Sequence, residues 1–469
     1  MTDDLQKEEL ELFVGLIMDK CGMRLTRNRL IRMKKVIVER MTEIGVNDIT
    51  EYYRSVTSGE KSGEELSRLC SSIMTGEHRF FTNEDILSKT AEYIADKVTS
   101  AKTRNGKPLA RVWFPYCSWG EDPYSFSMLL TQKLEPGMMK SVEILATGTN
   151  RYDVEKACTA MYPSSSLTEL GRDRITRYFK SEEAGKKVTK NIRNMVTFGL
   201  IDLVNGIFPS MLNGTSGLHL IVLRNVLTFY NWKIAERIIS KFHECLYEDG
   251  LLLLGVGERL PNMAGWEGVE GTEGRMYRRK NTASIPGVSP GLEVLKTSGH
   301  VAPGVSSTMR SPKGRNLYVE RAQDYLSTGQ TRKALITLTE AVSSGVDDAR
   351  IYLRLADLYA SRNDIEVAEK KCYKAIDIDA TCAEAHVLLG VIKLRKGHYK
   401  ESMDNLRKAL FIDPNNHEVK LHIARVLDRM GKRTAAREVY TRIVNEGGDS
   451  SSPLIMDVAK KALEEVSVN

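Results

Sequence analysis

Long apolar runs are absent from this sequence, and so is the chemistry of a secretory leader. No uninterrupted apolar stretch reaches the ~18 residues that a membrane-spanning helix needs. The chain opens with Met1, Thr2, Asp3 and Asp4 and continues with a run rich in glutamate, which does not suit a signal peptide. We therefore expect a cytoplasmic protein that does not insert into membranes.

Cysteine is scarce and scattered. The 7 cysteines form no Cys-x-x-Cys pair, and none stands at metal-ligand spacing from a histidine. An odd number of dispersed residues favours reduced thiols, mostly in the core, and the sequence predicts no metal site. The cysteines are Cys21, Cys70, Cys117, Cys158, Cys245, Cys372 and Cys382.

Hydrophobic periodicity changes near residue 110. Apolar residues recur at helical spacing from residue 8 to 56, which predicts a small all-helical start. Beyond residue 110, short β-rich runs alternate with helical stretches, so we expect an α/β domain whose mainly parallel sheet is covered on both faces. The predicted strands are Arg111–Tyr116, Val142–Thr147, Met195–Phe198, Leu218–Leu223 and Leu251–Val256, and the helices between them include Pro123–Gln132, Arg151–Met161 and Lys233–Tyr247.

A strict 34-residue period marks the C-terminal region. Gly329, Asn363, Gly397 and Gly431 recur at this interval, and three further series, mostly of small residues, keep the same step. Small residues let two antiparallel helices approach, and glycine or asparagine suits the turn between them. The region therefore resembles tetratricopeptide (TPR) repeats, an all-α solenoid closed by a capping helix at Pro453–Val466.

Such an array has no chemistry of its own, and we expect its concave groove to bind a peptide or a second protein. Packing against the rest of the chain is the alternative. The segment 281–315 has no periodicity and collects prolines among glycine, serine and threonine, which is typical of a linker. We divide the chain into a helical domain at 1–95, an α/β domain at 96–280, a flexible linker at 281–315 and, at 316–469, four TPR units plus a capping helix.

Several motifs in the α/β region resemble the CheR family of chemoreceptor methyltransferases. The turn after the first predicted strand reads Trp113-Phe114-Pro115-Tyr116-Cys117-Ser118-Trp119-Gly120-Glu121-Asp122-Pro123-Tyr124-Ser125, close to the family's W-S-A-G-C-S-T-G-E-E-P-Y-S. Further on, the family's R-N-V-L segment and G-x-S-E end are matched by Arg224-Asn225-Val226-Leu227 and Gly255-Val256-Gly257-Glu258. The resemblance covers residues 8 to 279.

The resemblance implies a class I S-adenosylmethionine-methyltransferase fold, which is Rossmann-like, and methyl transfer from S-adenosylmethionine to glutamate side chains of chemoreceptors. A carboxylate is already a nucleophile, so most of the catalysis must come from alignment of donor and acceptor. By position, the resemblance assigns Glu121, Asp122, Asp202, Arg224 and Asn225 to the cofactor pocket. Acids in a first helical turn also suit the helix dipole, so a structural role for the first two stays open.

The donor side departs from the family pattern. Tyr116 and Trp119 replace the family's glycine and threonine, which puts two large rings where the backbone should approach a ligand closely. Gly148 replaces the strand-end aspartate that is expected to hold cofactor hydroxyls. We therefore expect a vestigial or altered cofactor pocket.

The acceptor side departs as well. Thr82 replaces the family's arginine beside the transferring methyl group, and a short neutral hydroxyl cannot steer a carboxylate as a guanidinium does. Phe229 replaces a tyrosine, with Tyr230 displaced by one place, and His78 and His219 replace a threonine and an aspartate. Lone histidines are more often packing or surface residues than general bases. We assign no catalytic residue and regard Thr82, Phe229 and Tyr230 as degenerate positions.

Basic residues crowd the segment from Arg24 to Arg40. One interpretation is a solvated helix face, and the other is a docking surface for an acidic helical partner such as a chemoreceptor. We take Arg24, Arg27, Arg32 and Lys35 as candidate partner-binding residues. No aromatic side chains are interleaved with these charges, so we do not expect nucleic acid.

Two functions fit the sequence. The first is a non-catalytic or strongly impaired receptor-binding scaffold whose repeats recruit a second protein. The second is an active S-adenosylmethionine-dependent protein-glutamate O-methyltransferase, rebuilt around Tyr116, Trp119 and Glu121 and regulated by its repeats. We favour the first, because the departures fall on donor and acceptor positions while the motifs of the fold are kept.

Overall fold

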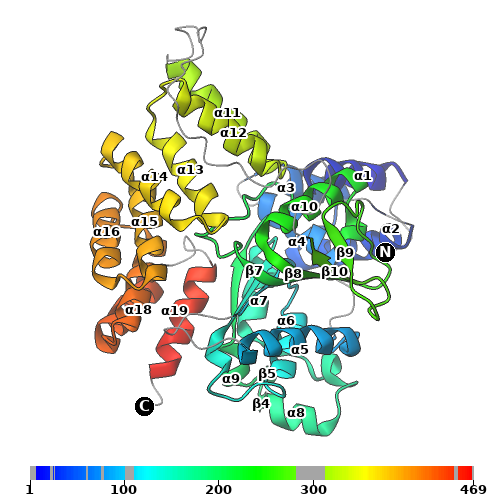
Figure 1. The fold of residues 1–469 in the computed structure, drawn as a ribbon. Helices are drawn as coiled ribbons and strands as arrows, with labels where there is room; N and C mark the ends of the chain where they lie inside the picture. Colours follow the sequence, from blue (N-terminus) through cyan, green and yellow to red (C-terminus); the bar gives the residue numbers. More distant parts are fainter. Residues whose placement is uncertain are drawn as a thin grey trace.

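The computed structural model of the protein describes residues 7–21, 25, 27–59, 62–74, 79–100, 110–280, 312–447 and 453–466 (Figure 1). Residues 281–311 of the predicted linker lie outside these ranges, and so do Arg24 and His78. Within the described ranges, every helix is too short or too polar to cross a membrane.

Four helices build the N-terminal domain: α1 (Lys7–Cys21), α2 (Arg27–Ile44), α3 (Ile49–Thr57) and α4 (Ser62–Met74). Their apolar side chains meet in one core, which confirms the all-helical start. The next helix, α5 (Glu84–Ser100), packs on the sheet instead. The boundary predicted at residue 95 therefore falls inside a helix of the α/β domain.

A seven-stranded sheet forms the centre of the α/β domain, in the order β6-β2-β1-β7-β8-β10-β9. The first five strands in this order run parallel to one another. At the far edge, β10 pairs antiparallel with β8, and β9 pairs antiparallel with β10. The mainly parallel α/β prediction is confirmed, whereas the short antiparallel strands were not predicted. The strands are β1 (Ala110–Phe114), β2 (Val142–Gly148), β6 (Val196–Leu200), β7 (Leu218–Leu223), β8 (Leu246–Leu254), β9 (Trp266–Gly268) and β10 (Met276–Arg279).

Helices cover both faces of this sheet, as the side chains of β1 show. Val112 and Phe114 point into the core shared with α5, α6 (Glu121–Leu130) and α7 (Arg151–Thr159), and Trp113 points into the core shared with α10 (Trp232–Cys245). This alternation is what a strand buried on both faces requires. A small sheet of β3 (Met161–Tyr162), β5 (Gly185–Val188) and β4 (Phe179–Glu182), with the short helices α8 (Arg172–Tyr178) and α9 (Lys190–Arg193), follows α7.

Four antiparallel helix pairs follow, and the TPR prediction is confirmed. The turn residues Gly329, Asn363, Gly397 and Gly431 all have positive φ, between 67° and 82°, which is the conformation that the 34-residue series predicts. The first helix begins at Pro312, inside the segment predicted as linker, because proline suits the first helical position. The pairs are α11 (Pro312–Ser327) with α12 (Thr331–Ser343), α13 (Ala349–Ser361) with α14 (Ile365–Ile378), α15 (Ala383–Lys396) with α16 (Tyr399–Ile412), and α17 (His417–Arg429) with α18 (Arg433–Glu446).

The capping helix α19 (Pro453–Val466) also closes the edge of the main sheet (Figure 1). The Asp457 carboxylate, 6% exposed, accepts the Phe198 N–H of edge strand β6 (3.3 Å) and pairs with Lys461 (2.6 Å). Lys461 Nζ in turn donates to Val196 O of the same strand (2.5 Å). Two side chains one helical turn apart thus bond the free backbone groups of an edge strand. The last helix therefore joins the repeat array to the α/β domain.

We expect Asp457→Ala to lower the free energy of unfolding by about 2–4 kcal/mol, because it leaves the buried Phe198 N–H and the Lys461 ammonium without their partner. Urea denaturation followed by circular dichroism measures the change. Asp404→Ala, on the exposed surface of α16, is the matched control and should change stability by less than ~0.5 kcal/mol. Equal midpoints for the two variants would contradict this role of Asp457.

Candidate functional site

The turn between β1 and α6 lies at the carboxyl edge of the parallel sheet, where folds of this kind bind ligands. Cys117 N–H donates to Thr147 O near the end of β2 (2.9 Å), and Gly120 N–H donates to Cys117 O (2.8 Å). Gly120 has a φ of 97°, and a Cβ there would lie 3.1 Å from the Tyr124 ring. The turn is therefore tight, and both conformation and space require glycine at its last position.

Trp119 is held through its side chain and its main chain. The indole N–H donates to Asp153 Oδ1 in the first turn of α7 (3.1 Å). The Trp119 carbonyl oxygen accepts the Tyr162 hydroxyl (2.6 Å). The ring therefore spans from the turn to the start of α7.

Asp153 is the centre of this site, although the sequence analysis did not single it out. Its carboxylate is 4% exposed and accepts donors from three elements: Trp119, Asn150 Nδ2 (2.7 Å) and the Ser71 hydroxyl of α4. Asn150 also caps α7 by accepting the Asp153 N–H at Oδ1 (2.9 Å). The signal that could have found it is Asn-x-x-Asp directly after a strand, a capping pattern that brings both side chains together.

Tyr116 lies beside this network. Its hydroxyl oxygen is enclosed by protein, and burial raises the pKa of Tyr116 well above its ordinary value, with the Asp153 charge adding to the increase. Its ring packs against the core around Trp113. Side chains of this chain therefore occupy the space between the turn, α7 and α4.

Gly148 ends β2 in tight surroundings. A Cβ at this position would lie 2.8 Å from Val154 Cγ2, so the Val154 side chain would have to move to admit a larger residue. The Gly148 carbonyl oxygen accepts the Ile201 N–H (3.0 Å), which holds the segment after β6 close. Residues 148–150 offer no carboxylate at this strand end.

The acids assigned to the cofactor have other surroundings. Asp122 pairs with Arg224 (3.3 Å), so two of the assigned residues do meet at the sheet edge. Glu121 is 5% exposed at the start of α6. Asp202 accepts two main-chain N–H groups of its own turn (2.8 and 3.1 Å). This last carboxylate therefore closes its own turn, as an aspartate after a strand does readily, and its role toward a cofactor stays a prediction.

The loop after β7 is organised by Glu258, which is 4% exposed. Asn225 has a φ of 60°, and its N–H donates to Glu258 Oε2 (2.7 Å). The N–H groups of Leu227 (2.6 Å) and Gly255 (2.8 Å) bond the same carboxylate. One buried acid thus holds both the Arg-Asn and the Gly-x-x-Glu motifs, while Asn225 itself is exposed at the sheet edge.

The degenerate acceptor positions lie in separate surroundings. The Thr82 hydroxyl donates to Arg79 O within its own turn (3.2 Å). Phe229 packs into the core of the N-terminal helices, with the Arg29 guanidinium 3.7 Å from its ring centre. Tyr230 packs into the core between the sheet and α10. The displacement by one residue therefore places the two rings in different cores.

His219 lies at the opposite edge of the sheet. Near the start of β7, its Nδ1 accepts the Arg111 N–H (3.1 Å), and its ring centre is 4.9 Å from that of Tyr247. Burial, followed by the charges of Lys97 and Arg111, lowers the pKa of His219 from 6.5 to about 4. His219 is therefore a neutral hydrogen-bond acceptor of the fold, remote from the turn between β1 and α6.

These contacts test whether S-adenosylmethionine fits the site as it lies. A bound nucleoside needs an acceptor for its ribose hydroxyls and room beside the turn. Gly148 offers no acceptor, Asp202 closes its own turn, and Asp153 already binds three donors. The rings of Tyr116 and Trp119 stand beside that carboxylate. The side chains present therefore do not fit the cofactor in this arrangement.

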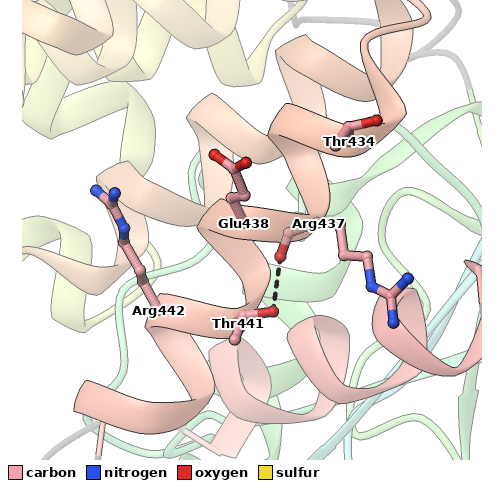
Figure 2. A pocket seen from close by; sticks show the side chains of 5 residues that line it. All are labelled: Thr434, Arg437, Glu438, Thr441 and Arg442. Atoms are coloured by element: carbon pink, nitrogen blue, oxygen red, sulfur yellow. Dashed lines mark hydrogen bonds between the residues drawn. The ribbon is translucent and has the colours of Figure 1, made fainter.

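A surface cavity of about 370 Å³ lies elsewhere, on the repeat array (Figure 2). Its lining side chains come from α18 alone, and their polar groups point in different directions in Figure 2, with one bond drawn among them, from the Thr441 hydroxyl to Arg437 O (2.9 Å). Because the side chains do not converge, this cavity offers no binding site. They are Thr434, Arg437, Glu438, Thr441 and Arg442.

We expect His219→Asn to make the protein less sensitive to acid. A histidine whose folded-state pKa is lowered from 6.5 to about 4 costs stability as the pH falls from 6.5 to 4, because the unfolded chain takes up the proton first. Asparagine keeps an acceptor for the Arg111 N–H and does not titrate. Over this interval the variant should lose about 1–3 kcal/mol less than the wild type, measured as unfolding free energy against pH. If the unfolding free energies of the variant and the wild type changed equally with pH, His219 would not be the cause of the acid sensitivity.

Comparisons with known proteins agree with the fold. The family described as CheR methyltransferase, SAM binding domain, matches residues 77–275, and two tetratricopeptide repeat families match residues 319–381 and 383–416. The family match therefore names S-adenosylmethionine as the cofactor of this domain type.

Relatives extend the likeness over both halves of the chain. A probable biofilm formation methyltransferase WspC from Pseudomonas aeruginosa is 24% identical over 452 residues, which cover 93% of this chain and 99% of the relative. Its counterpart from Pseudomonas putida is 21% identical over 446 residues, covering 93% and 98%. A chemotaxis protein methyltransferase 1 from Pseudomonas aeruginosa is 24% identical over 278 residues, covering 58% and 98%. The resemblance drawn from the motifs is thus confirmed, and this chain carries a CheR methyltransferase domain followed by tetratricopeptide repeats.

Proposed function

We propose that this protein acts in a bacterial chemosensory system as a receptor-binding scaffold whose methyl transfer is absent or strongly impaired. The observation that carries the proposal is the engagement of the Asp153 carboxylate by Trp119 and by Ser71, beside the buried Tyr116 hydroxyl. The chemotaxis methyltransferases among the relatives support the chemosensory setting. The repeat array supports recruitment of a second protein.

The energetic argument concerns the donor side. Methyl transfer to a carboxylate depends on alignment, because the nucleophile needs no activation. A nucleoside that bound against Asp153 would compete with Trp119 and Ser71 for this carboxylate, and the loss of one of these buried hydrogen bonds would cost about 1.5–3 kcal/mol. Such a cost weakens cofactor binding by roughly 10- to 100-fold, before the loss of packing around the displaced ring is counted.

The acceptor side supports the same conclusion. Thr82 is bonded to its own turn and carries no charge to hold a glutamate against the donor. The Arg174 guanidinium lies 4.4 Å from the Phe81 ring centre, but it is paired with Glu84 through two bonds of 2.6 and 2.7 Å. This neighbouring cation is therefore already neutralised and does not take the place of the missing arginine.

Recognition of a receptor needs the helical domain to stay in a defined position, and its contacts favour this. Arg29 donates to Thr228 O (2.6 Å) and to Thr228 Oγ1 (2.8 Å) in the loop after β7. The hydroxyl of Ser71 on α4 bonds Asp153 on α7. Two separate sets of hydrogen bonds thus connect the N-terminal helices to the α/β domain.

The structure describes part of the basic surface that the sequence predicts. Arg32 Nε donates to Ser72 O (3.0 Å), so this residue partly serves to hold α4. Lys35 remains outward, with 74% of its side chain exposed and Glu39 at 3.6 Å. Arg24 and the side chain of Arg27 lie outside the described residues. Of the two candidates whose side chains the structure describes, Arg32 and Lys35, Lys35 is therefore the more available to a partner.

The alternative function is an active protein-glutamate O-methyltransferase, and Glu121 is the residue that favours it. This carboxylate is retained at the start of α6 and could hold the cofactor once the two rings have moved. Transfer of labelled methyl groups to the cognate receptors would support this alternative. Full transfer activity in Glu121→Ala would remove Glu121 from the site.

We expect the wild-type chain to show no micromolar binding of S-adenosylmethionine in isothermal titration calorimetry. The double variant Tyr116→Gly/Trp119→Thr restores the family's residues and frees one lone pair of Asp153, so its affinity should rise by about 10-fold or more. Clear micromolar binding by the wild type would count decisively against the scaffold proposal.

The control for this titration is Trp232→Thr, which removes an exposed tryptophan from the start of α10 without touching the turn. It should leave the titration unchanged. Thermal melts of the wild type and of both variants report whether the fold is kept.

We expect Lys35→Glu to weaken binding of a cognate receptor's cytoplasmic fragment by about 2- to 10-fold at low salt, because charge reversal on an exposed surface replaces attraction with repulsion. High salt should reduce the difference. Lys408→Glu on α16 makes the same change of net charge far from α2 and is the control. Equal affinities for both variants in a pull-down would remove α2 from the receptor interface.

A further inference from the structure

The connection from β6 to β7 carries a loop that reaches the repeat array. Residues 207–213, which we call the docked loop, contact the second helix pair. The Ser210 hydroxyl donates to Asp357 Oδ1 of α13 (3.2 Å), and the Ser361 hydroxyl of α13 donates to Pro209 O (3.3 Å). Residues about 150 positions apart in the sequence are thus bonded to each other.

The docked loop meets the inner side of the array. In Figure 1, α13 and α15 lie nearer to the α/β domain than their partners α14 and α16 do. Asp357 and Ser361 are one turn apart on α13, and the 34-residue period places Val391 and Arg395 at the same positions of α15. Burial and the charge of Arg111 in β1 lower the pKa of Arg395 to about 10, so this side chain also lies close to the α/β domain. The inner face is therefore turned toward the methyltransferase half of the same chain.

An apolar anchor accompanies the polar contacts. Met211 is 2% exposed and belongs to the core of the repeats rather than to the core of its own domain. Val387 and Val391, on the inner side of α15, are each 7% exposed and belong to the same cluster. Side chains on the inner face of a solenoid are open to solvent unless something covers them. The groove, which we define by Asp357, Ser361, Val387 and Val391, is therefore covered.

Asp357 is the polar recognition element of the groove. The Asp357 side chain is half-buried. Burial raises the pKa of its carboxyl, and the Ser210 hydroxyl, the charge of Arg354 and the Met211 N–H oppose the increase. Because desolvation of a carboxylate is costly, donors from an occupant of the groove stabilise it. The Ser210 hydroxyl and the next main-chain N–H, at the start of the turn 211–214, supply such donors together.

The docked loop is held in shape by its own bonds. Ser210 N–H donates to Thr215 Oγ1 (3.0 Å), and the Thr215 hydroxyl donates to Asn213 Oδ1 (2.6 Å). Asn213 Nδ2 donates to Ile207 O across the loop (2.9 Å). A loop ordered in advance loses little conformational entropy on docking, which favours occupation of the groove.

We propose that the groove is a binding site for a loop segment in which a hydroxyl residue precedes a long, flexible apolar residue, and that the docked loop fills this site in cis until a partner protein with the same chemistry displaces it. The serine supplies the donor for Asp357, and the methionine fills the space beside Val391. Because methionine adapts to irregular surfaces, a leucine or methionine in the partner suits the site equally.

The cis arrangement sets the strength of competition. A tethered segment acts at an effective concentration of about the millimolar range. A partner with the same intrinsic affinity therefore binds the intact chain roughly 10- to 100-fold more weakly than it binds a chain whose groove has been emptied. Recruitment through the array is therefore restrained by the methyltransferase half of the chain.

The test uses the full chain and a fluorescein-labelled peptide with the sequence of residues 205–216. Met211→Asp places a charge in the apolar part of the groove and should drive the docked loop out. In fluorescence anisotropy, this variant should bind the peptide about 10-fold or more tightly than the wild type does. Met263→Asp changes a methionine that is 48% exposed elsewhere in the α/β domain and should behave as the wild type.

A second peptide, with aspartate in place of the methionine, should bind none of the proteins. If the wild type and Met211→Asp bound the first peptide equally well, the docked loop would not be occupying the groove. If a folded Met211→Asp chain failed to bind this peptide, the groove would not be a binding site. If that variant does not fold, Ser210→Asp takes its place, since it sets a second carboxylate against Asp357. It should admit the first peptide with the same gain in affinity.

Discussion

The buried carboxylate of Asp153 has to be hydrogen-bonded, and its three donors come from three different parts of the chain. Ser71 belongs to the N-terminal helices, Trp119 to the turn after β1, and Asn150 to the cap of α7. The position of the helical domain, the shape of the turn and the start of α7 therefore depend on one another. Where the family resemblance implies contacts to a cofactor, this chain supplies contacts to itself.

The repeat array is joined to the same region from the other side. The connection that carries the docked loop begins at Ile201, whose N–H bonds Gly148 O beside the candidate site. At its middle it fills the groove of α13 and α15, and α19 holds the strand β6 that precedes it. A single segment thus runs from the candidate site to the repeat array.

Much of the fold could be predicted from local patterns. The 34-residue period located every turn between paired helices, because positive φ selects glycine or asparagine without help from distant residues. The boundary near residue 95 was placed inside α5, since a helix that packs on a sheet and a helix in a bundle share one periodicity. The sequence assigns Asp202 to a cofactor and Arg32 to a partner protein, and it gives no sign that both side chains also bond nearby main-chain groups.

The sequence by itself determined the parallel sheet, the repeats, the family and the substitutions at Tyr116, Trp119 and Gly148. Each of these depends on residues that are neighbours along the chain or that recur at a fixed step. Only the tertiary structure decided what those substitutions contact. The bonds of Asp153 with Ser71 and of Ser210 with Asp357 join residues 82 and 147 positions apart. No local pattern encodes such pairs, since burial and the need to satisfy a carboxylate arise only when the domains pack together.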